Sequence, residues 1–199
     1  QDTNNSDQRL KLLNILNHDV QRIERLITDY SQMLKDEVAL SKEKMKKINI
    51  EPIIQSVVDD YNSIYKVKKD IKINYEDDGK KEYSINGIEN RIEQMIANLL
   101  DNSISFTEKG GKIIVNISIS SNRKITVKII DEGQGFKEKD TSKIFRRFYS
   151  NRPDKFGEHS GLGLNIVKNL VELHDGKILA SNRPNNKGAI IEISFPSIQ

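Results

Sequence analysis

The chain has 199 residues, of which 36% are hydrophobic and 31% are charged, and its formal net charge is +3. This composition suits a soluble globular protein, and because basic residues are interleaved with acidic ones we expect no nucleic-acid partner. The chain contains no cysteine, which excludes disulfides and thiolate metal sites and fits a reducing cytosol, and it shows neither a membrane-spanning apolar run nor a signal peptide.

The N-terminal quarter of the chain has the pattern of a single long helix. Residues 1–51 contain neither Gly nor Pro, and seven apolar residues follow one another at intervals of three and four. These residues are Leu13, Leu16, Val20, Ile23, Ile27, Tyr30 and Leu34. The pattern predicts a helix from about residue 7 to about residue 47. A surface helix on a globular core would show a wider apolar stripe, so the narrow seam favours a bundle or coiled coil.

After residue 50 the sequence changes to shorter elements. Pro52 suits the first turn of a helix that runs to about Lys66, and alternating residues predict strands at "DIKINYE" and "EYSIN". A helix from about Ile88 to Ser105 and a strand pair at "KIIVNISIS" and "KITVKIID" follow. Residues 132–160 have few core positions, and a loop of this length is typical of a functional lid or of a disordered segment. The helix "GLGLNIVKNLVELH" and the strands "GKILASN" and "GAIIEISFP" complete an α/β sandwich.

Four segments of this second part stand out. Asn98 and Asn102 lie four residues apart on a predicted helix, "DEGQGF" (131–136) ends a strand, and "GEHSGLGL" (157–164) leads into a helix. In this order they resemble the N, G1 and G2 boxes of the ATP-binding domain of sensor histidine kinases, and "KIFRRFY" (143–149) resembles the F box between them. The run "NSISF…RFYSNRP…FGEHSGLGL" is similar to the ChvG-type sensors of envelope and acid stress in alphaproteobacteria.

The resemblance covers the chain after Ile50. It implies an α/β (α+β) sandwich of the histidine kinase, gyrase and Hsp90 ATPase type, preceded by one long bundle or coiled-coil helix. It further implies that residues 1–48 are the second helix of the dimerisation and phosphotransfer hairpin, which is incomplete here, and that residues 49–199 are the ATP-binding catalytic domain.

Asp131 ends an apolar strand, where a carboxylate is costly unless it has a partner. A carboxylate accepts a hydrogen bond from the exocyclic amine of adenine, and the resemblance assigns this role to Asp131. Gly133 and Gly135 allow the tight backbone that a closely bound base requires. An ordinary strand-end turn would explain "DEG" alone, but it would not explain the other boxes.

The segment "SGLGLNIV" places glycines at the start of a helix, where free N–H groups and the positive end of the helix dipole suit phosphates. The alternative is a flexible helix cap. The resemblance implies that Ser160, Gly161, Leu162, Gly163 and Leu164 bind the nucleotide, with Gly161 and Gly163 as the phosphate-loop glycines.

Arg147 resembles the F-box basic residue that approaches the terminal phosphate, which makes it a predicted catalytic residue together with Asn98. Its neighbour Arg146 could take the same role, and either side chain could instead be a solvated charge of the lid.

The spacing of four places Asn98 and Asn102 on one helix face. Carboxamide oxygens are hard ligands that suit Mg²⁺, so we predict that the pair binds Mg²⁺ together with ATP. Related ATPases carry a Glu base at the position of Asn98, and because an amide cannot accept a proton at neutral pH, the pair is predicted to be a metal clamp without a hydrolytic base. Family members commonly have Lys where this chain has Ser105, so that charge must come from elsewhere or phosphate binds less tightly.

His18 in "NHDVQRI" is a possible phosphoacceptor, because family acceptors are followed by an acidic residue. However, no Pro occurs before Pro52, the apolar seam continues without a break, and "DVQRIERLITDYSQML" resembles the second hairpin helix. We therefore predict that His18 is not the acceptor and that the chain contains none. His174, near a helix end, is predicted to be structural, and His159 receives no role.

The sequence thus predicts a fragment of a sensor histidine kinase that binds MgATP and transfers the γ-phosphate to a histidine, for relay to a response regulator. The resemblance implies a homodimer formed through the helix bundle and a cytosolic location as part of an inner-membrane sensor, and the lack of an initial Met fits a piece of a longer protein. One alternative is a superfamily ATPase or protein-serine kinase, against which Asn98 argues. Another is a nucleotide-binding pseudokinase, against which Asn102 and Asp131 argue.

Overall fold

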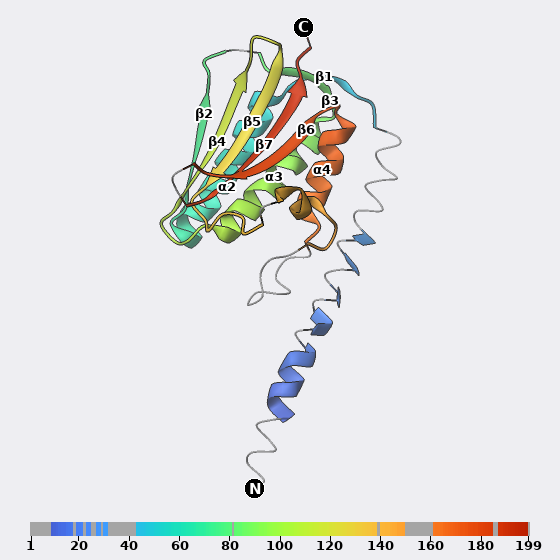
Figure 1. Cartoon of the computed structure of the whole chain (residues 1–199), viewed down its shortest axis with the longest axis vertical. Coiled ribbons are helices and arrows are strands. Elements are labelled where there is room, and N and C mark those ends of the chain that lie inside the picture. The colour runs from blue at the N-terminus through green and yellow to red at the C-terminus, as the bar shows by residue number, and fades with distance from the viewer. Residues whose placement is uncertain are drawn as a thin grey trace. The chain divides into compact units, whose positions relative to one another are not determined.

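The computed structural model describes residues 9–17, 19–21, 23–24, 27–28, 30–31, 43–80, 82–138, 140–149, 161–184 and 187–198 (Figure 1). The described residues fall into two units, one within Gln1–Lys42 and Arg147–Leu162 and the other within Glu43–Arg146 and Gly163–Gln199. None of the helices that they form is both long enough and apolar enough to cross a membrane.

The N-terminal part of the first unit is helical wherever it is described, up to residue 31. Its apolar side chains are exposed, including Leu13 at 63% and Leu16 at 59%. Exposed side chains at heptad spacing are expected of a helix whose seam packs against a further helix. His18 and Leu34 lie outside the described residues.

The prediction that this helix continues to about Lys47 is wrong. Residues 43–45 are irregular, and Lys46–Asn49 form strand β1, which pairs antiparallel with β3 (Ser84–Gly87). The side chain of Ile48 is only 7% exposed. Strand pairing and burial of this apolar position therefore override the helix propensity of the lysine-rich segment.

The second unit contains, in its described residues, two sheets and the helices that pack on them. After β1 come α2 (Ile50–Lys69), β2 (Lys72–Asp77), β3, α3 (Glu89–Phe106), β4 (Lys112–Ile119), β5 (Lys124–Asp131), the 3₁₀ helix η1 (Thr141–Phe145), α4 (Gly163–Leu173), β6 (Lys177–Asn182) and β7 (Ala189–Pro196). One sheet has the order β1-β3, and the other has the order β2-β4-β5-β7-β6. In the larger sheet β2 is parallel to β4, and the other neighbours are antiparallel.

The core lies between the five-stranded sheet and the helices α2, α3 and α4, which Figure 1 shows together on one face of that sheet. Side chains along β4 and β5 alternate between buried and half-buried, as expected of strands with one covered face. The buried residues of these strands are Ile113, Val115, Ile117, Ile125, Val127, Ile129 and Asp131. The predicted α/β sandwich is confirmed, and the helices and strands predicted after residue 50 are all present.

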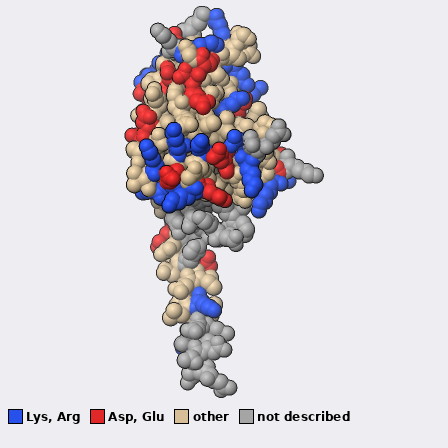
Figure 2. All heavy atoms as spheres, turned by 90° about the vertical axis from the view of Figure 1, so that its left-hand side faces the viewer, with Lys and Arg blue, Asp and Glu red and all other residues tan. Residues whose placement is uncertain are grey.

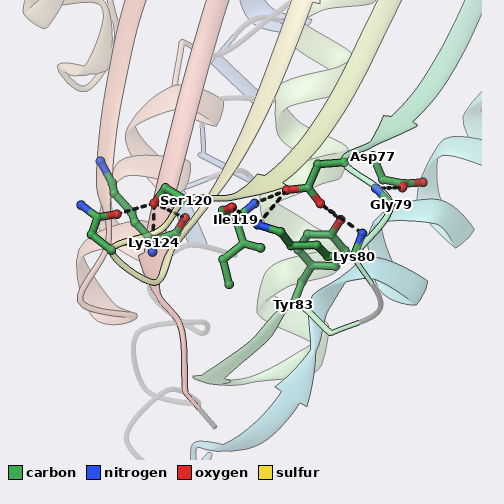
Figure 3. Close-up of polar contacts among 9 residues, drawn as sticks. Asp77, Gly79, Lys80, Tyr83, Ile119, Ser120 and Lys124 are labelled. Atoms are coloured by element: carbon green, nitrogen blue, oxygen red, sulfur yellow. Dashed lines mark hydrogen bonds and ion pairs between the residues drawn. The ribbon is translucent and has the colours of Figure 1, made fainter.

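Asp78, in the loop after β2, is hydrogen-bonded to Tyr83 and to Ile119 at the end of β4, and Figure 3 labels these two partners. Its carboxylate accepts hydrogen bonds from the Ile119 N–H at 2.8 Å and from the Tyr83 hydroxyl, and Lys80 Nζ donates to the Ile119 carbonyl at 2.6 Å. Burial and the neighbouring carboxylate raise the pKa of Tyr83 to about 12, so the phenol remains a donor at neutral pH. These bonds hold the edge strand β2 at the end of the sheet opposite to Asp131, as the register of β4 and β5 shows.

His174 joins the end of α4 to the start of α3. Its Nε2 accepts a hydrogen bond at 3.1 Å from the N–H of Ile88, the N-cap residue of α3, and its Nδ1 donates to the Leu170 carbonyl at 2.7 Å. This arrangement requires neutral imidazole, because a protonated Nε2 would present a second donor to the Ile88 N–H. Burial lowers the pKa of His174. These contacts support the predicted structural role of this residue.

We expect the stabilising contribution of His174 to be lost in acid. Because its pKa is lowered on folding, the contribution is complete above the ordinary value of 6.5 and falls as the pH drops from there through the folded-state pKa. Urea unfolding can be measured for the parent and for His174→Gln at about pH 7.5 and about pH 5.5. The free energy of unfolding should fall more in the parent than in the variant between these pH values, by at most about 1.4 kcal/mol per pH unit. Equal losses would contradict this role, since shared carboxylate effects cancel in the comparison.

Acidic and basic side chains are interspersed over the face of the molecule drawn in Figure 2. A field of one sign, which would attract a polyanion, needs like charges gathered together. The mixed surface fits the small net charge of +3, and the predicted lack of a nucleic-acid partner remains a prediction.

Candidate functional site

Asn98 and Asn102 lie one turn apart on α3, beside the start of α4. Both side chains are half-buried, and neither amide has a hydrogen-bond partner among the residues that the structure describes. The Cβ that Gly163 lacks would lie 3.5 Å from Asn98 Oδ1, so this amide lies against the first residue of α4. The two amides are therefore available to a ligand where α3 meets the N-terminal end of α4. A shared nucleotide site requires the N box on α3 and the G2 box at the start of α4 to lie together in this way.

Asp131 is a buried carboxylate at the end of β5, with 3% of its surface exposed. Its Oδ1 accepts hydrogen bonds from the N–H groups of Gly133 at 2.9 Å and Ala189 at 3.1 Å. Burial raises the pKa of Asp131, and these N–H groups, the Arg183 charge and a hydrogen bond from the Ser103 hydroxyl act in the opposite direction. Since both backbone donors use Oδ1, neither of them occupies the other carboxylate oxygen, which can accept from a ligand that brings a donor.

Two glycines let the backbone approach Asp131 closely. A Cβ on Gly188 would lie 2.0 Å from the Asp131 carbonyl oxygen, and a Cβ on Gly133 would lie 2.9 Å from the carbonyl oxygen of Phe106, the last residue of α3. No larger residue fits either position without moving the backbone. The predicted need for glycine at Gly133 therefore has a specific cause, which is the contact between the G1 segment and the end of α3.

Asn182, the last residue of β6, holds the G1 segment in place. Its Oδ1 accepts a hydrogen bond from the Phe136 N–H at 2.6 Å, and its Nδ2 donates to the Phe136 carbonyl at 2.9 Å. The side chain thus pairs with this residue as a neighbouring strand would. Gly135, which has a φ of +76°, lies directly beside it, since a Cβ there would be 2.7 Å from Asn182 Oδ1.

Arg183 borders the Asp131 site from the turn after β6. Its NH1 donates to the Asp131 carbonyl at 3.4 Å and lies 3.8 Å from Glu132 Oε1. Glu132 Oε2 also accepts a hydrogen bond from the N–H of Lys112 at 3.0 Å. These contacts tie the last turn of the sheet to the start of the predicted lid.

The described start of the predicted lid, residues 132–138 and 140–149, has more core contacts than its sequence indicated. In η1, Ile144 and Phe145 are 5% and 6% exposed, and Asn165 Nδ2 donates to the Phe145 carbonyl at 2.9 Å. The Thr141 hydroxyl donates to the Ala180 carbonyl at 2.7 Å. The prediction of few core positions is therefore wrong for the F-box half of this stretch, because η1 packs on α4 and β6.

The remaining predicted site residues belong partly to the first unit. There Gly161 has a φ of +72°, and a Cβ on it would lie 2.8 Å from the Tyr149 carbonyl oxygen. Leu162 is buried, whereas Arg147 is exposed. Ser160 lies outside the described residues. The phosphate roles of these residues, and the choice between Arg147 and its neighbour, stay predictions.

Gly163 and Leu164 are the first residues of α4, as the sequence predicted. The free N–H groups of the helix start therefore lie beside Asn98, which the missing Cβ of Gly163 brings close. No group of three or more His, Cys, Asp or Glu side chains suited to a metal ion occurs in the described part of the chain. The donor available at this point is amide oxygen, which fits Mg²⁺ that keeps water and phosphate ligands.

Sequence reasoning missed five residues that shape this site. They are Ser103, Asn182, Arg183, Gly188 and Ala189. The only local signals were a glycine placed just before the last strand and a serine next to Asn102. The partners of these residues lie far away in the sequence, so motif spacing could not reveal them.

Comparison with known proteins is consistent with this geometry. The family of histidine kinase-, DNA gyrase B- and HSP90-like ATPases matches residues 87–199. Sensor protein ChvG of Rhizobium meliloti is 34% identical over 198 residues, which are 96% of this chain and 34% of that protein. Sensor protein ChvG of Agrobacterium fabrum is 35% identical over 196 residues, which are 95% of this chain and 33% of that protein. The chain thus spans about a third of the length of these relatives.

Solved structures share the fold. The nucleotide-free catalytic domain of histidine kinase ThkA has a TM-score of 0.66 at 26% identity, covering 78% of this chain and 97% of that one. ThkA in a complex with the response regulator protein TrrA has a TM-score of 0.67 at 24% identity, covering 86% of this chain and 48% of that one. The second likeness concerns the fold alone.

Proposed function

Because the chain belongs to the family of histidine kinase-, DNA gyrase B- and HSP90-like ATPases, we propose that it binds ATP with Mg²⁺ and transfers the γ-phosphoryl group to a histidine. The observation that carries this proposal is the buried Asp131 carboxylate, oriented by the N–H groups of Gly133 and Ala189. A carboxylate fixed in this way accepts from an N–H donor such as the amino group of adenine. The ChvG relatives that match nearly the whole chain are sensor proteins.

Asn98 and Asn102 would hold Mg²⁺ through their amide oxygens, and the bound ion would neutralise charge on the phosphates. Residues 160–164, which end in the first turn of α4, would bind phosphate oxygens through main-chain N–H groups. The exposed Arg147, or Arg146 beside it, would bring positive charge to the terminal phosphate. Catalysis would then consist mainly of positioning and charge neutralisation.

Asn98 favours transfer over hydrolysis. Its amide cannot take a proton from water, whereas a histidine nucleophile brings its own lone pair. The Ser105 hydroxyl donates to the Asn102 carbonyl at 2.6 Å, so it is directed to its own helix and does not replace the lysine of related kinases. A superfamily ATPase would need a base in place of Asn98, and a pseudokinase would not need the oriented Asp131.

We place the second hairpin helix in the part of residues 1–48 that precedes β1. The catalytic domain comprises residues 49–199 together with the earlier residues of β1, which pairs with β3. The exposed heptad positions near the N-terminus support a bundle in which the parent protein dimerises and its first helix supplies the acceptor histidine. That parent would be an inner-membrane sensor with this part in the cytosol, and it would pass the phosphoryl group to a response regulator. His18 is not the proposed acceptor.

Incubation with γ-labelled ATP tests this function. The chain should bind MgATP in calorimetry but should not label itself, because the acceptor helix is absent. A separate fragment with both hairpin helices should acquire acid-labile, alkali-stable label when this chain is added, and Asp131→Ala should abolish that labelling. Label on this chain that disappears in His18→Gln would make His18 the acceptor, and a lack of nucleotide binding would overturn the proposal.

A further inference from the structure

The segment just before β1 is attached to the start of α3 by a two-pronged ion pair. Arg91 Nε donates to Glu43 Oε2 at 3.1 Å, and Arg91 NH2 donates to Glu43 Oε1 at 3.0 Å. Arg91 NH1 also donates to Gln94 Oε1 at 3.0 Å, and Asn90 Nδ2 donates to Glu43 Oε1 at 3.4 Å. Such fork-to-carboxylate pairing fixes both direction and distance.

Burial makes this pair different from its neighbour on the surface. The Arg91 side chain is 8% exposed and that of Glu43 is 26% exposed, whereas the nearby Lys46–Glu89 pair is 65% and 61% exposed. A buried guanidinium is tolerated only when it is paired, so removal of the Glu43 carboxylate, which accepts from Arg91 at two atoms, would weaken the pairing of a buried charge. The exposed pair is screened by water and contributes little.

The position of the pair connects two functional parts. Glu43 is the first residue of the second unit, and the irregular residues 43–45 that lead into β1 are called the linker below. Arg91 precedes Asn98 by seven residues, which is two turns or roughly 10 Å along α3, and so it shares a face of the helix with Asn98 and Asn102. The linker is therefore fastened to the same helix that carries the proposed metal-binding amides.

We propose that Glu43 and Arg91 form a latch that positions the linker on α3, and that this latch sets the rate at which an acceptor histidine attached through the linker receives the phosphoryl group. The hydrogen bonds described for the pair involve none of the residues proposed to bind the nucleotide, so it is a positioning pair and not a catalytic one. This inference rests on the proposed kinase function, and it adds a control point outside the four sequence motifs.

Three variants of the parent kinase test the latch. Glu43→Gln keeps the side-chain size but removes the negative charge that faces Arg91. The double variant Glu43→Leu with Arg91→Met removes both charges and retains apolar volume, which guards against a simple loss of folding. Glu89→Gln, which breaks only the exposed pair, is the matched control.

We expect both latch variants to slow transfer to the attached acceptor by about tenfold. MgATP affinity, and transfer to the same hairpin supplied as a separate fragment, should stay within about twofold, because neither depends on the linker. Trypsin cleavage after Lys44 should become about tenfold faster, because local opening near Glu43 becomes easier. Glu89→Gln should change none of these rates.

A parallel fall in nucleotide affinity would show that the pair merely supports the fold, and unchanged transfer with unchanged cleavage would refute the latch. If the unsubstituted kinase transfers nothing to either acceptor, the proposed function fails, and the rate of cleavage after Lys44 then decides separately whether Glu43 holds the linker.

Discussion

Asp131→Asn is expected to lower the affinity for MgATP by about 100-fold or more while leaving the fold intact. The amino group of adenine would lose the carboxylate that accepts its hydrogen bond and would face the amide NH₂ of the new side chain, which is also a donor. The side chain keeps its size, and its Oδ1 can still accept from Gly133 and Ala189. The new amide nitrogen must then replace the second carboxylate oxygen, which is the atom that the N–H of adenine would approach. Removal of a buried charge also relieves a folding cost.

The same substitution gives a test of base recognition. Guanine carries a carbonyl acceptor where adenine carries its amino group, so the ratio of GTP affinity to ATP affinity should rise in Asp131→Asn. Calorimetric titration with both nucleotides measures this ratio, and thermal unfolding checks the fold. Asp101→Asn, which alters an exposed carboxylate of α3 bonded to the Tyr61 hydroxyl, should leave both affinities unchanged. Unaltered ATP affinity in Asp131→Asn would show that this carboxylate does not read adenine.

The elements that the sequence predicted well are those with a local physical signal. Alternation in β4 and β5 follows directly from one buried face, and α3 and α4 have apolar stripes at helical spacing. The end of the first helix was predicted wrongly because β1 is only four residues long and exists through its pairing with β3. Helix propensity depends on the local sequence, so it could not indicate that β1 pairs with β3 about forty residues away.

The candidate site divides in the same way. Asp131, Gly133 and Asn98 stand out by motif, since their chemistry is unusual for an apolar strand end or helix. The role of Asn182 could not be predicted from the sequence. Its side chain makes two hydrogen bonds to the backbone of Phe136, which lies 46 residues earlier in the chain. Ser103 likewise acts through its contact with Asp131, which depends on how α3 crosses the sheet.

The F-box segment shows why polarity alone misjudges a lid. Its basic and small residues indicate a solvated loop, yet Ile144 and Phe145 are buried and η1 is capped by the Asp140 side chain. Two apolar side chains in a short 3₁₀ turn are enough to anchor it against α4, where Asn165 bonds the Phe145 carbonyl. Two neighbouring apolar residues in so short a 3₁₀ helix give no repeating hydrophobic pattern, so the sequence did not predict that they are buried.

The second large effect is expected from Asn102→Ala. Transfer of the γ-phosphoryl group to the hairpin fragment should fall by about 100-fold or more, because a metal ion supplies several kcal/mol of charge stabilisation at the phosphates. Alanine is the best helix former, so α3 should remain intact. Nucleotide affinity measured with excess chelator should not change, whereas the gain in affinity on adding Mg²⁺ should disappear.

Two further variants separate metal binding from general damage. Asn116→Ala removes a half-exposed amide from β4, on the opposite face of the sheet from the buried Val115, and it should leave transfer and Mg²⁺ dependence unchanged. Asn102→Asp keeps a hard oxygen ligand and should retain the Mg²⁺-dependent gain in affinity that Asn102→Ala loses. The measurements are labelled-phosphate transfer and calorimetry over a range of Mg²⁺ concentrations. If Asn102→Ala transfers at the parental rate with the parental Mg²⁺ dependence, these amides do not hold the metal, and the open pair on α3 must serve another ligand.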